Sequence, residues 1–308
     1  MSNWRILVTD GLAPQGLATL RQQAEVVEAA GLEELPDVDG LIIRSRTLVT
    51  GEDLRRAQPR LRVVGRAGVG VDNIDVAAAR QVGVIVVNAP LASTDAVAEH
   101  TLALMLALAR RLPQADASLR RGEWRKSEFL GTELGGKTLG LIGLGRIGAA
   151  VAERARALGM AVVAYDPLLS PEEIAVRGAR PLGLQALLAE ADYLSLHVPL
   201  TPDTRGLLDA HALARLRPGA RVVCTARGGL VDEAALLAAL DTGRLAGAAL
   251  DVFEEEPPRP GPLLNHPALI LTPHIAAQTV EAQARAALDI VAEVLAALRG
   301  QGLRWQIA

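Results

Sequence analysis

A glycine-rich stretch near the middle of the chain constrains its fold more than any other feature. The residues from Thr138 to Ile142 form a short apolar run, and an Ala-rich segment reaches Leu158 just before Gly159. Between them lie Gly143, Gly145 and Gly148. An apolar strand, a tight turn and an amphipathic helix have this pattern, and a glycine after the last helical residue ends a helix. The stretch therefore predicts a strand–turn–helix unit.

The spacing of these glycines predicts a dinucleotide site. The first permits the tight turn, the second lets a backbone approach a pyrophosphate, and the third lets the helix lie close on its strand. Amides at the start of the helix and the helix dipole favour phosphate groups. A second strand, Met160–Tyr165, ends at Asp166, where an acidic side chain binds a ribose hydroxyl. Asp166 favours NAD over NADP because its carboxylate repels a 2′-phosphate. The plainer alternative is a strand–turn–helix whose glycines serve only packing.

Length and composition favour two domains with aliphatic cores. A chain of 308 residues is too long for one small domain. Half of the residues are hydrophobic but only 2% are aromatic, so the core must consist of Ala, Val, Leu and Ile. Those residues suit helices packed on buried parallel strands. The net charge of −3 and the lack of a basic stretch with interleaved aromatics argue against nucleic-acid binding.

The cysteine content and the N-terminus limit the compartment. A single cysteine excludes an internal disulfide framework and a cysteine-based metal cluster, and we expect no metal site. Cys224 lies in an apolar run, where a buried thiol is expected. The first residues, Met1–Arg5, contain no apolar signal segment, and the apolar stretch Thr101–Ala109 is too short to span a bilayer. We therefore expect a cytoplasmic protein with no membrane partner.

Short apolar strands alternate with helical segments along most of the chain, which predicts an α/β fold with two doubly wound parallel sheets. The expected strands are Arg5–Thr9, Leu41–Arg44, Leu61–Gly65, Val84–Val87, Leu139–Ile142, Ala161–Tyr165, Tyr193–His197, Arg221–Thr225, Gly247–Asp251 and Leu269–Thr272. The last helix, Thr279–Arg299, is expected to return to the first unit. The first domain, residues 1–90 plus 277–308, is then discontinuous around a second domain of residues 91–276. The helix Thr94–Arg111 is apolar nearly all round, so we expect it to be buried between domains or subunits.

Charged residues follow several of these strands, at the edge where ligands bind in open α/β sheets. They are Arg44, Arg66, Arg227, Asp251 and His274. Their number predicts a cleft between two domains lined by arginines, acids and one histidine. Taken singly, each has a plainer interpretation: Arg227 as a surface arginine, His274 as a loop histidine, and Glu256 as part of a solvated acidic turn before two prolines.

Several blocks resemble the D-isomer-specific 2-hydroxyacid dehydrogenases, in order and over nearly the whole chain. They are residues 65–75, 88–90, 98–101, the glycine stretch with 165–167, and residues 226–233, 248–257 and 272–274. The resemblance implies a Rossmann-type NAD domain inserted in a flavodoxin-like substrate domain. It also implies NAD as cofactor, hydride transfer at C2 of a D-2-hydroxyacid, and a homodimer formed largely through helices of the NAD domain.

By resemblance, Arg227, Glu256 and His274 are the catalytic residues. His274 would be the general base when a 2-hydroxyl is oxidised and the general acid in the reverse reaction, with Glu256 on its other ring nitrogen. Arg227 would hold the substrate carboxylate, because its planar fork suits bidentate binding. The other cofactor-binding residues implied by the resemblance are Arg146, Ile147, Val198, Thr225, Ala226, Asp251, Ala276 and Ala277.

The resemblance also bears on the substrate. Arg44 and Arg66 match phosphate-binding arginines of family members that act on a phosphorylated 2-hydroxyacid in serine biosynthesis, and Gly68 and Val69 would offer amides to its carboxylate. Arg44 as a mere surface charge is the alternative. Two other functions stay open: a hydroxypyruvate or glyoxylate reductase of the same family, and a non-enzymatic NAD-sensing protein on the same fold. The sequence ends at Ala308, so no regulatory domain is expected.

Overall fold

The chain folds into two compact units in a computed structural model that describes residues 4–308. Unit 1 comprises the described residues up to Thr94 together with Ala277–Ala308, and unit 2 comprises Asp95–Ala276. The first three residues of the predicted first domain lie outside the described part of the chain. Within residues 4–308, no helix has both the length and the apolar character needed to cross a membrane.

Unit 1 contains a parallel five-stranded sheet in the order β2-β1-β3-β4-β5. Its strands are β1 (Arg5–Val8), β2 (Glu25–Glu28), β3 (Gly40–Ile43), β4 (Val63–Arg66) and β5 (Ile85–Asn88). This order is that of flavodoxin-like sheets. Because β3 and β4 are hydrogen-bonded neighbours, the segments that follow them leave the sheet side by side.

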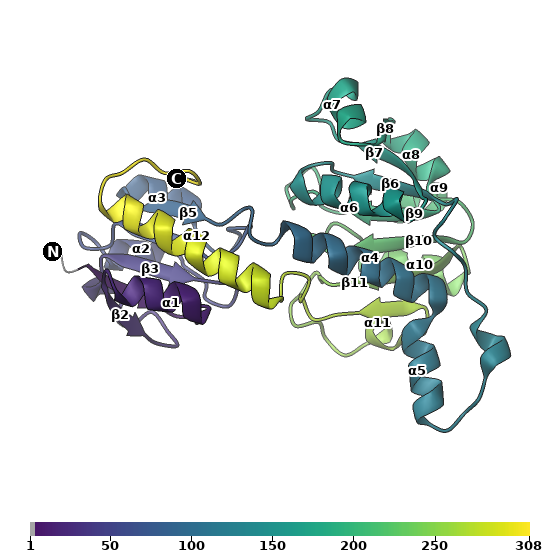
Figure 1. Cartoon of the computed structure of the whole chain (residues 1–308), viewed down its shortest axis with the longest axis horizontal. Coiled ribbons are helices and arrows are strands. Elements are labelled where there is room, and N and C mark those ends of the chain that lie inside the picture. Colours follow the sequence, from purple (N-terminus) through teal and green to yellow (C-terminus); the bar gives the residue numbers. More distant parts are fainter. Residues whose placement is uncertain (1–3) are drawn as a thin grey trace. The chain divides into compact units, whose positions relative to one another are not determined.

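Helices cover both faces of this sheet (Figure 1). They are α1 (Pro14–Arg21), the 3₁₀ turn η1 (Leu35–Asp37), α2 (Gly51–Arg56), α3 (Val76–Val82) and α12 (Val280–Leu298). On one face, α1 and α12 bury side chains such as Ile290 and Val294 against Ile42, while α2 and α3 pack on the other. A Cβ on Gly65 would lie 2.5 Å from a Val294 methyl, so a glycine in β4 lets α12 approach the sheet.

Unit 2 contains a parallel seven-stranded sheet in the order β12-β11-β10-β9-β6-β7-β8. Its strands are β6 (Thr138–Ile142), β7 (Ala161–Tyr165), β8 (Arg180–Pro181), β9 (Tyr193–Leu196), β10 (Ala220–Cys224), β11 (Leu245–Leu250) and β12 (Leu269–Leu271). The direction of winding reverses between β6 and β9, which is the Rossmann arrangement. Ligands bind outside the carboxyl ends of the strands at such a switch point.

Two helical layers enclose the sheet of unit 2 (Figure 1). The helical segments are α4 (Thr94–Arg110), α5 (Leu112–Arg120), η2 (Lys126–Phe129), α6 (Arg146–Ala157), α7 (Pro171–Val176), α8 (Leu184–Glu190), α9 (Ala210–Arg215), α10 (Glu233–Asp241) and α11 (Pro262–Asn265). On one face α4 and α6 share a core with the sheet, in which Met105 of α4 and Val151 of α6 meet Val223. Helices α8, α9 and α10 pack on the other face. Figure 1 shows α5 and the segment after it projecting from the body of the unit.

The predicted fold class, two doubly wound parallel sheets, is confirmed. Two strands were not predicted. The edge strand β2 has the sequence Glu-Val-Val-Glu and is only half-buried, so it lacks the apolar run that marks the other strands. Strand β8 has two residues, one of them a proline, which is too short for any pattern. Both lie at sheet edges, where few hydrophobic contacts constrain the sequence.

Candidate active site

The glycine turn between β6 and α6 leaves no room for side chains at two of its three glycines. Gly143 has a φ of 90°, and a Cβ there would lie 2.6 Å from the carbonyl oxygen of His197. A Cβ on Gly148 would lie 2.3 Å from the carbonyl oxygen of Gly143. By contrast, a Cβ on Gly145 would meet no atom of the described residues within 4 Å. The turn is therefore tightly packed on the protein side and open at Gly145.

Helix α6 begins directly after this open glycine. The helix has 12 residues, and its N-cap is Gly145, which has no side chain with which to cap the first turn. The first N–H groups of a helix and the positive end of its dipole attract phosphate. The residues present therefore fit a dinucleotide, whose pyrophosphate would approach the open glycine and the start of α6, where the predicted Arg146 and Ile147 lie.

Asp166 follows β7 and lies beside the same turn. Its Oδ2 accepts a hydrogen bond from the amide of Leu144 at 2.8 Å, and its Oδ1 accepts one from the amide of Leu168 at 3.0 Å. Each carboxylate oxygen has two lone pairs, so the side chain can still accept hydrogen bonds from a ribose. Val198, another predicted cofactor-binding residue, lies against Gly143, with its Cγ1 2.7 Å from a Cβ built there.

His197 supports the turn as a neutral side chain. Burial lowers the pKa of His197 to about 4, because an imidazolium would lose its hydration. Its Nε2 lies 3.0 Å from the hydroxyl of Ser195, which is fully buried. The imidazole is therefore uncharged at neutral pH and places no cation beneath the proposed pyrophosphate site.

Unit 2 also brings together the predicted acid–base pair. Nδ1 of His274 lies 2.7 Å from Oε2 of Glu256, and the other carboxylate oxygen, Oε1, accepts a hydrogen bond from the amide of Phe253 at 3.1 Å. The two side chains are 43% and 38% exposed, so the pair faces outward. Because Nδ1 is held by the carboxylate, Nε2 is the ring nitrogen that can exchange a proton with a bound molecule.

The environment keeps Glu256 ionised. Partial burial acts to raise the pKa of this carboxyl group, but the hydrogen bond with His274, the charge of that ring and the Phe253 amide together hold the pKa below its usual value. A histidine bonded to an ionised carboxylate is a common general acid–base group. The pair therefore has the electrostatics of a proton-transfer site.

The backbone at His274 is held in an unusual conformation. Its φ is 52°, in the left-handed region that residues other than glycine seldom adopt. The amide of His274 donates to the carbonyl oxygens of Asp251 at 2.9 Å and Thr272 at 3.0 Å. These bonds to the end of β11 and to the residue after β12 fix the direction in which the imidazole leaves the backbone.

Asp251 anchors the segment that carries His274. Its side chain is fully buried and accepts hydrogen bonds from the hydroxyl of Thr272 at 2.6 Å and from the amides of Ile275 and Ala276, both at 2.8 Å. Burial acts to raise the pKa of Asp251, but these donors together with His100 lower it below its usual value, so the group is an anion. Asp251 was predicted to bind the cofactor, and that stays a prediction; its role as an anchor was not foreseen.

Arg227 follows β10 and lies in the same unit as the pair. A Cβ on the next residue, Gly228, would lie 1.7 Å from the carbonyl oxygen of Phe253, so the turn after Arg227 is packed directly on the loop that carries Glu256. The guanidinium donates to the carbonyl oxygen of Ala226 at 2.6 Å. All three residues predicted to be catalytic thus project from adjoining loops at the carboxyl edge of β10, β11 and β12.

A cavity of about 380 Å³ opens beside the acid–base pair. Its lining is mainly apolar and includes Phe253, Glu256, Pro257, Leu271, Thr272 and His274. A mostly apolar cavity with a few convergent polar groups is the usual form of a small-molecule site. In the described part of the chain, no three His, Cys, Asp or Glu side chains form a group that suits a metal ion.

The predicted substrate-binding residues gather at one edge of unit 1. Ile43 of β3 is the register partner of Arg66 in β4, so Arg44 and Arg66 leave neighbouring strands. Gly68 has a φ of 157°, and a Cβ there would lie 1.6 Å from Nη1 of Arg66, so the guanidinium lies against the Gly68 backbone. The carbonyl oxygen of Val69 accepts a hydrogen bond from a neighbouring asparagine side chain at 2.6 Å.

Two polar side chains fix these loops, and neither was predicted. Asp10, at the end of β1, accepts hydrogen bonds from the backbone amides of Arg44 at 2.8 Å, Arg46 at 3.1 Å and Thr47 at 3.1 Å. Asn88, at the end of β5, is the residue that donates to Val69. The place of each residue at the end of a buried strand was the only local signal, and it does not show which backbone groups the side chain meets, since these lie 34 and 19 residues away.

The last two predicted cofactor-binding residues lie on the boundary between the units. Ala276 is the final residue of unit 2, and Ala277 is the first residue of the returning segment of unit 1. Ala276 is bonded to Asp251, as described, whereas the carbonyl oxygen of Ala277 accepts from the side chain of Gln283 in α12 at 2.9 Å. Each alanine is thus held by its own unit.

The fold and the site together define a dinucleotide-binding α/β protein with an acid–base pair at the carboxyl edge of its Rossmann sheet. The chain belongs to the D-isomer specific 2-hydroxyacid dehydrogenases, since the model of that family's NAD binding domain matches residues 102–276. The family membership and the NAD cofactor predicted from the sequence are thereby confirmed.

Individual relatives agree with this assignment. The chain is 49% identical over 302 residues to the D-3-phosphoglycerate dehydrogenase of Mycobacterium tuberculosis, a match that covers 96% of this chain and 57% of that protein. The chain thus spans little more than half the length of the curated relatives that it matches. Among solved structures, the TT0316 protein from Thermus thermophilus superposes with a TM-score of 0.92 at 39% identity, covering 99% of this chain and 100% of the other. A glyoxylate reductase from Paecilomyes thermophila superposes with a TM-score of 0.89 at 31% identity, covering 100% and 99%.

Proposed function

We propose that the protein is an NAD-dependent D-3-phosphoglycerate dehydrogenase that serves serine biosynthesis. The main support for dehydrogenase activity is the 2.7 Å contact between Nδ1 of His274 and Oε2 of Glu256 on a Rossmann unit. The observation that favours a phosphorylated substrate is the pair Arg44 and Arg66 on neighbouring strand ends of unit 1. The name of the relatives at 44–49% identity agrees with both.

In the proposed reaction, His274 moves the proton and Arg227 holds the substrate. Nε2 of His274 takes the proton of the 2-hydroxyl during oxidation and returns it during reduction. Glu256 orients the ring through Nδ1 and stabilises the imidazolium that forms. The guanidinium of Arg227 binds the substrate carboxylate and polarises the oxygen on C2. NAD, when bound, supplies the acceptor for the hydride from C2.

The proposed cofactor site is the turn between β6 and α6. Gly143, Gly145 and Gly148 shape the turn, and the start of α6 receives the pyrophosphate. Asp166 accepts hydrogen bonds from the adenosine ribose and disfavours a 2′-phosphate by repulsion. The backbone at Thr225, Ala226 and Val198 lines the cofactor. Unit 1, with Arg44, Arg66, Gly68 and Val69, is the proposed substrate-binding domain.

A substrate panel tests the activity. Initial rates are measured with 3-phosphoglycerate, phosphohydroxypyruvate, hydroxypyruvate and glyoxylate, each with the NAD and NADP forms of the cofactor. We expect the phosphorylated pair to have the highest kcat/KM, because two arginines recognise the phosphate. A reductase of hydroxypyruvate or glyoxylate, favoured by the likeness to the glyoxylate reductase from Paecilomyes thermophila, is the second candidate. Equal kcat/KM with and without phosphate would establish it in place of the first.

Cofactor choice has its own test at Asp166. Replacing Asp166 with Ala removes the repulsion of a 2′-phosphate, so the ratio of kcat/KM for NADH to that for NADPH is expected to fall at least tenfold, the effect of about 1.4 kcal/mol. Glu172 in α7 is a nearby acidic residue of the same unit, and Glu172→Ala serves as the control. An unchanged ratio in the Asp166 variant means that this carboxylate does not read the ribose.

We further propose that the protein is a homodimer formed through the projecting segment of unit 2. Large apolar side chains are exposed along it: Leu112 and Leu119 of α5 at 52% and 59%, Trp124 at 81% and Leu130 at 89%. Leu106, in the last turns of the preceding helix α4, is also 40% exposed. Apolar side chains gathered on one projecting segment mark an interaction surface. A second copy of this chain is the proposed occupant.

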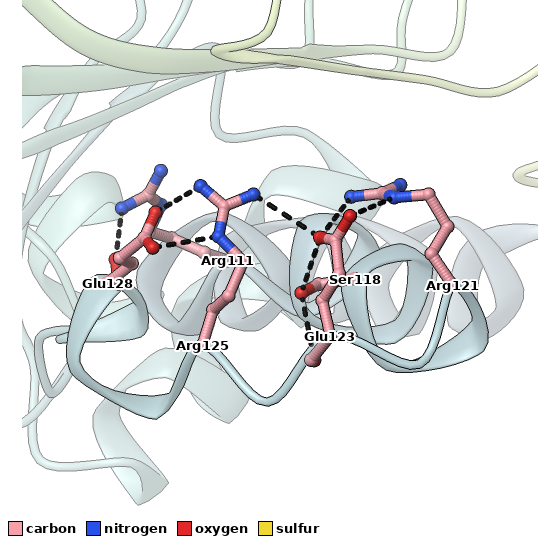
Figure 2. A network of polar contacts seen from close by, with 6 residues as sticks. All are labelled: Arg111, Ser118, Arg121, Glu123, Arg125 and Glu128. Carbon is pink, nitrogen blue, oxygen red and sulfur yellow. Dashed lines mark hydrogen bonds and ion pairs between the residues drawn. The ribbon is translucent and has the colours of Figure 1, made fainter.

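Ion pairs give the projecting segment a defined shape. Figure 2 shows Glu123 between Arg121 and Arg125, with Ser118 donating to the backbone of Glu123 at 3.2 Å, and Glu128 paired with Arg125. Trp124 stands between Glu123 and Arg125 in the sequence, so these ion pairs hold the backbone on both sides of it.

The dimer is tested by substitution at Trp124. We expect Trp124→Glu to yield a monomer by sedimentation equilibrium. Leu168→Glu, at a similarly exposed leucine elsewhere in the unit, should leave the dimer intact. A Trp124→Glu dimer of wild-type stability would contradict the proposal.

A further inference from the structure

Two consecutive residues of α4, His100 and Thr101, are bonded to two different loops of the candidate active site. His100 contacts Thr272, two residues before His274. Thr101 contacts Thr225, two residues before Arg227. No sequence feature assigned either residue a role in the site. Each contact spans more than a hundred residues of the chain, so α4 links the two loops that hold the proposed catalytic side chains.

The bond of His100 has a defined direction. The hydroxyl of Thr272 donates its one proton to Asp251 at 2.6 Å. The contact at 3.2 Å between Nε2 of His100 and the same hydroxyl therefore requires the ring to be the donor. Nε2 also lies 3.5 Å from Oδ1 of Asp251, so one N–H faces both oxygens. His100 thus completes the donor set around the carboxylate that anchors the His274 segment.

The bond of Thr101 can be assigned in the same way. Its hydroxyl donates to the carbonyl oxygen of Val97 in the preceding turn at 2.8 Å. The 2.9 Å contact between the hydroxyls of Thr101 and Thr225 therefore has Thr225 as its donor. Thr101 is fully buried and Thr225 is 5% exposed. Without Thr101, the buried hydroxyl of Thr225 would lose its acceptor, at a cost in free energy. The bond therefore holds the backbone just before Arg227 in place.

The helix that carries these two residues is itself firmly held. Ala98, Leu102 and Met105 of α4 are buried in the core shared with β10 and β11. A rigid element is a better base for a site than a loop, because its side chains keep one geometry. The two loops meanwhile lie at the ends of different strands, so a shared helix gives them a common reference.

We propose that His100 and Thr101 are positioning residues that set the separation and orientation of His274 and Arg227. The proposal rests on the proposed dehydrogenase function of those two residues. His100 acts through Thr272 and Asp251 on the segment of His274, and Thr101 acts through Thr225 on the segment of Arg227. Neither contacts a reacting group, so both affect the rate of the reaction more than the binding of the cofactor.

The test compares three variants in the full-length protein. His100→Ala removes the donor, whereas His100→Gln keeps an N–H donor at similar reach. Thr101→Val removes the hydroxyl without changing the shape of the side chain. A small misplacement of a catalytic group costs up to about 100-fold in rate, so we expect kcat to fall about 10- to 100-fold in His100→Ala and Thr101→Val. The Kd for NADH, from fluorescence titration, should change less than about twofold, and His100→Gln should recover most of kcat.

Matched controls separate this effect from general damage. His211→Ala removes an exposed histidine of α9, and Thr19→Val removes a threonine of α1 with the same bond to the preceding turn, at 2.9 Å to Gln15. Both should keep wild-type kcat. Wild-type kcat in both His100→Ala and Thr101→Val would overturn the proposal, and so would a loss of NADH binding in parallel with kcat in His100→Gln.

A second readout does not depend on turnover. The protein has five histidines, so selective ¹⁵N labelling gives a small set of ring signals. We expect the Nδ1 signal of His274, bonded to Glu256, to shift in His100→Ala and not in His211→Ala. If the wild-type protein turns over no 2-hydroxyacid, the proposed function fails, while this signal still decides whether His100 holds His274 in place. An unshifted signal would overturn the positioning role.

Discussion

The two units use the same device at the edges that carry their proposed functional residues, but with different chemistry. In unit 1, Asp10 at the end of β1 anchors the loop of Arg44. In unit 2, Asp251 at the end of β11 anchors the loop of His274. Each carboxylate is buried, accepts backbone amides from the segment after a neighbouring strand, and also accepts a threonine hydroxyl, at 2.7 Å from Thr47 and 2.6 Å from Thr272.

The difference lies in how the amides are distributed over the two carboxylate oxygens. All three amides at Asp10 converge on Oδ2, while Oδ1 faces the hydroxyl of Thr47 and an exposed Arg46. At Asp251, the amide of Ile275 is on Oδ1 and that of Ala276 is on Oδ2. Only an ionised carboxylate has two oxygens that both act solely as acceptors. The loop of His274 therefore depends on the charge of Asp251, whereas the amides in the loop of Arg44 need only one oxygen of Asp10. The proposed proton-transfer residue, His274, is thus held more strictly than the proposed phosphate-binding residue, Arg44.

The largest expected effect is on catalysis in unit 2. His274→Ala removes the proposed proton-transfer group and should lower kcat by about 10²- to 10⁴-fold, with the Kd for NADH unchanged. Steady-state rates and fluorescence titration of NADH measure the two quantities. Loss of NADH binding along with kcat would indicate that the residue supports the fold of the cofactor site instead.

The second prediction concerns the anchors themselves. In Asp251→Asn one oxygen becomes an NH₂ group that faces a backbone N–H, so we expect a loss of about 2–4 kcal/mol in the free energy of unfolding. In Asp10→Asn the carbonyl oxygen can keep all three amides while the NH₂ group faces the hydroxyl of Thr47, so the expected loss is about 1 kcal/mol or less. Urea unfolding followed by circular dichroism measures both. Equal losses in the two variants would mean that the loop of Arg44 depends on an ionised carboxylate as much as the loop of His274 does.

The third prediction concerns what the loop of unit 1 binds. Arg44→Ala should raise the KM for 3-phosphoglycerate about 10- to 100-fold, the effect of losing a charged hydrogen bond of about 1.5–3 kcal/mol. The KM for glyoxylate, which has no phosphate, should stay the same. Arg46→Ala, two residues along the same loop, is the control. If the two substrates lose affinity equally, Arg44 is not part of a phosphate site.

The smallest expected effect is on the pH dependence of stability. The pKa values of Asp10 and Asp251 are both lowered in the folded protein. A group with a lowered folded pKa contributes stability above its unfolded pKa of about 3.9, and this contribution is lost as the pH falls through the folded pKa. Stability should therefore decline below about pH 4, and each Asp→Asn variant should show a shallower decline. An unchanged slope in both variants would mean that neither carboxylate titrates in this range.

Much of this molecule could be predicted from its sequence because its signals are local. The glycine turn at Gly143 and the apolar strands are read from consecutive residues, and the helix at Val280–Leu298 is read from its periodic apolar face. Asp10 and His100 could not be found in this way. Their partners lie 34 to 172 residues away, and single polar residues have no periodicity. Asp251 was singled out by its place at a strand end, but its burial and its four donors depend on packing that no local pattern records.

The position of the boundary between the units has a consequence for engineering. Every donor to Asp251, including Ala276, belongs to Asp95–Ala276, and the chain passes into the other unit at the very next residue. In a chimera, Asp95–Ala276 of this chain could be joined to the parts of a relative that correspond to Met1–Thr94 and Ala277–Ala308. Such a chimera would keep the acid–base pair, Asp251 and the two α4 residues together from one parent. Substrate preference and proton chemistry should therefore be separable by grafting at these two junctions.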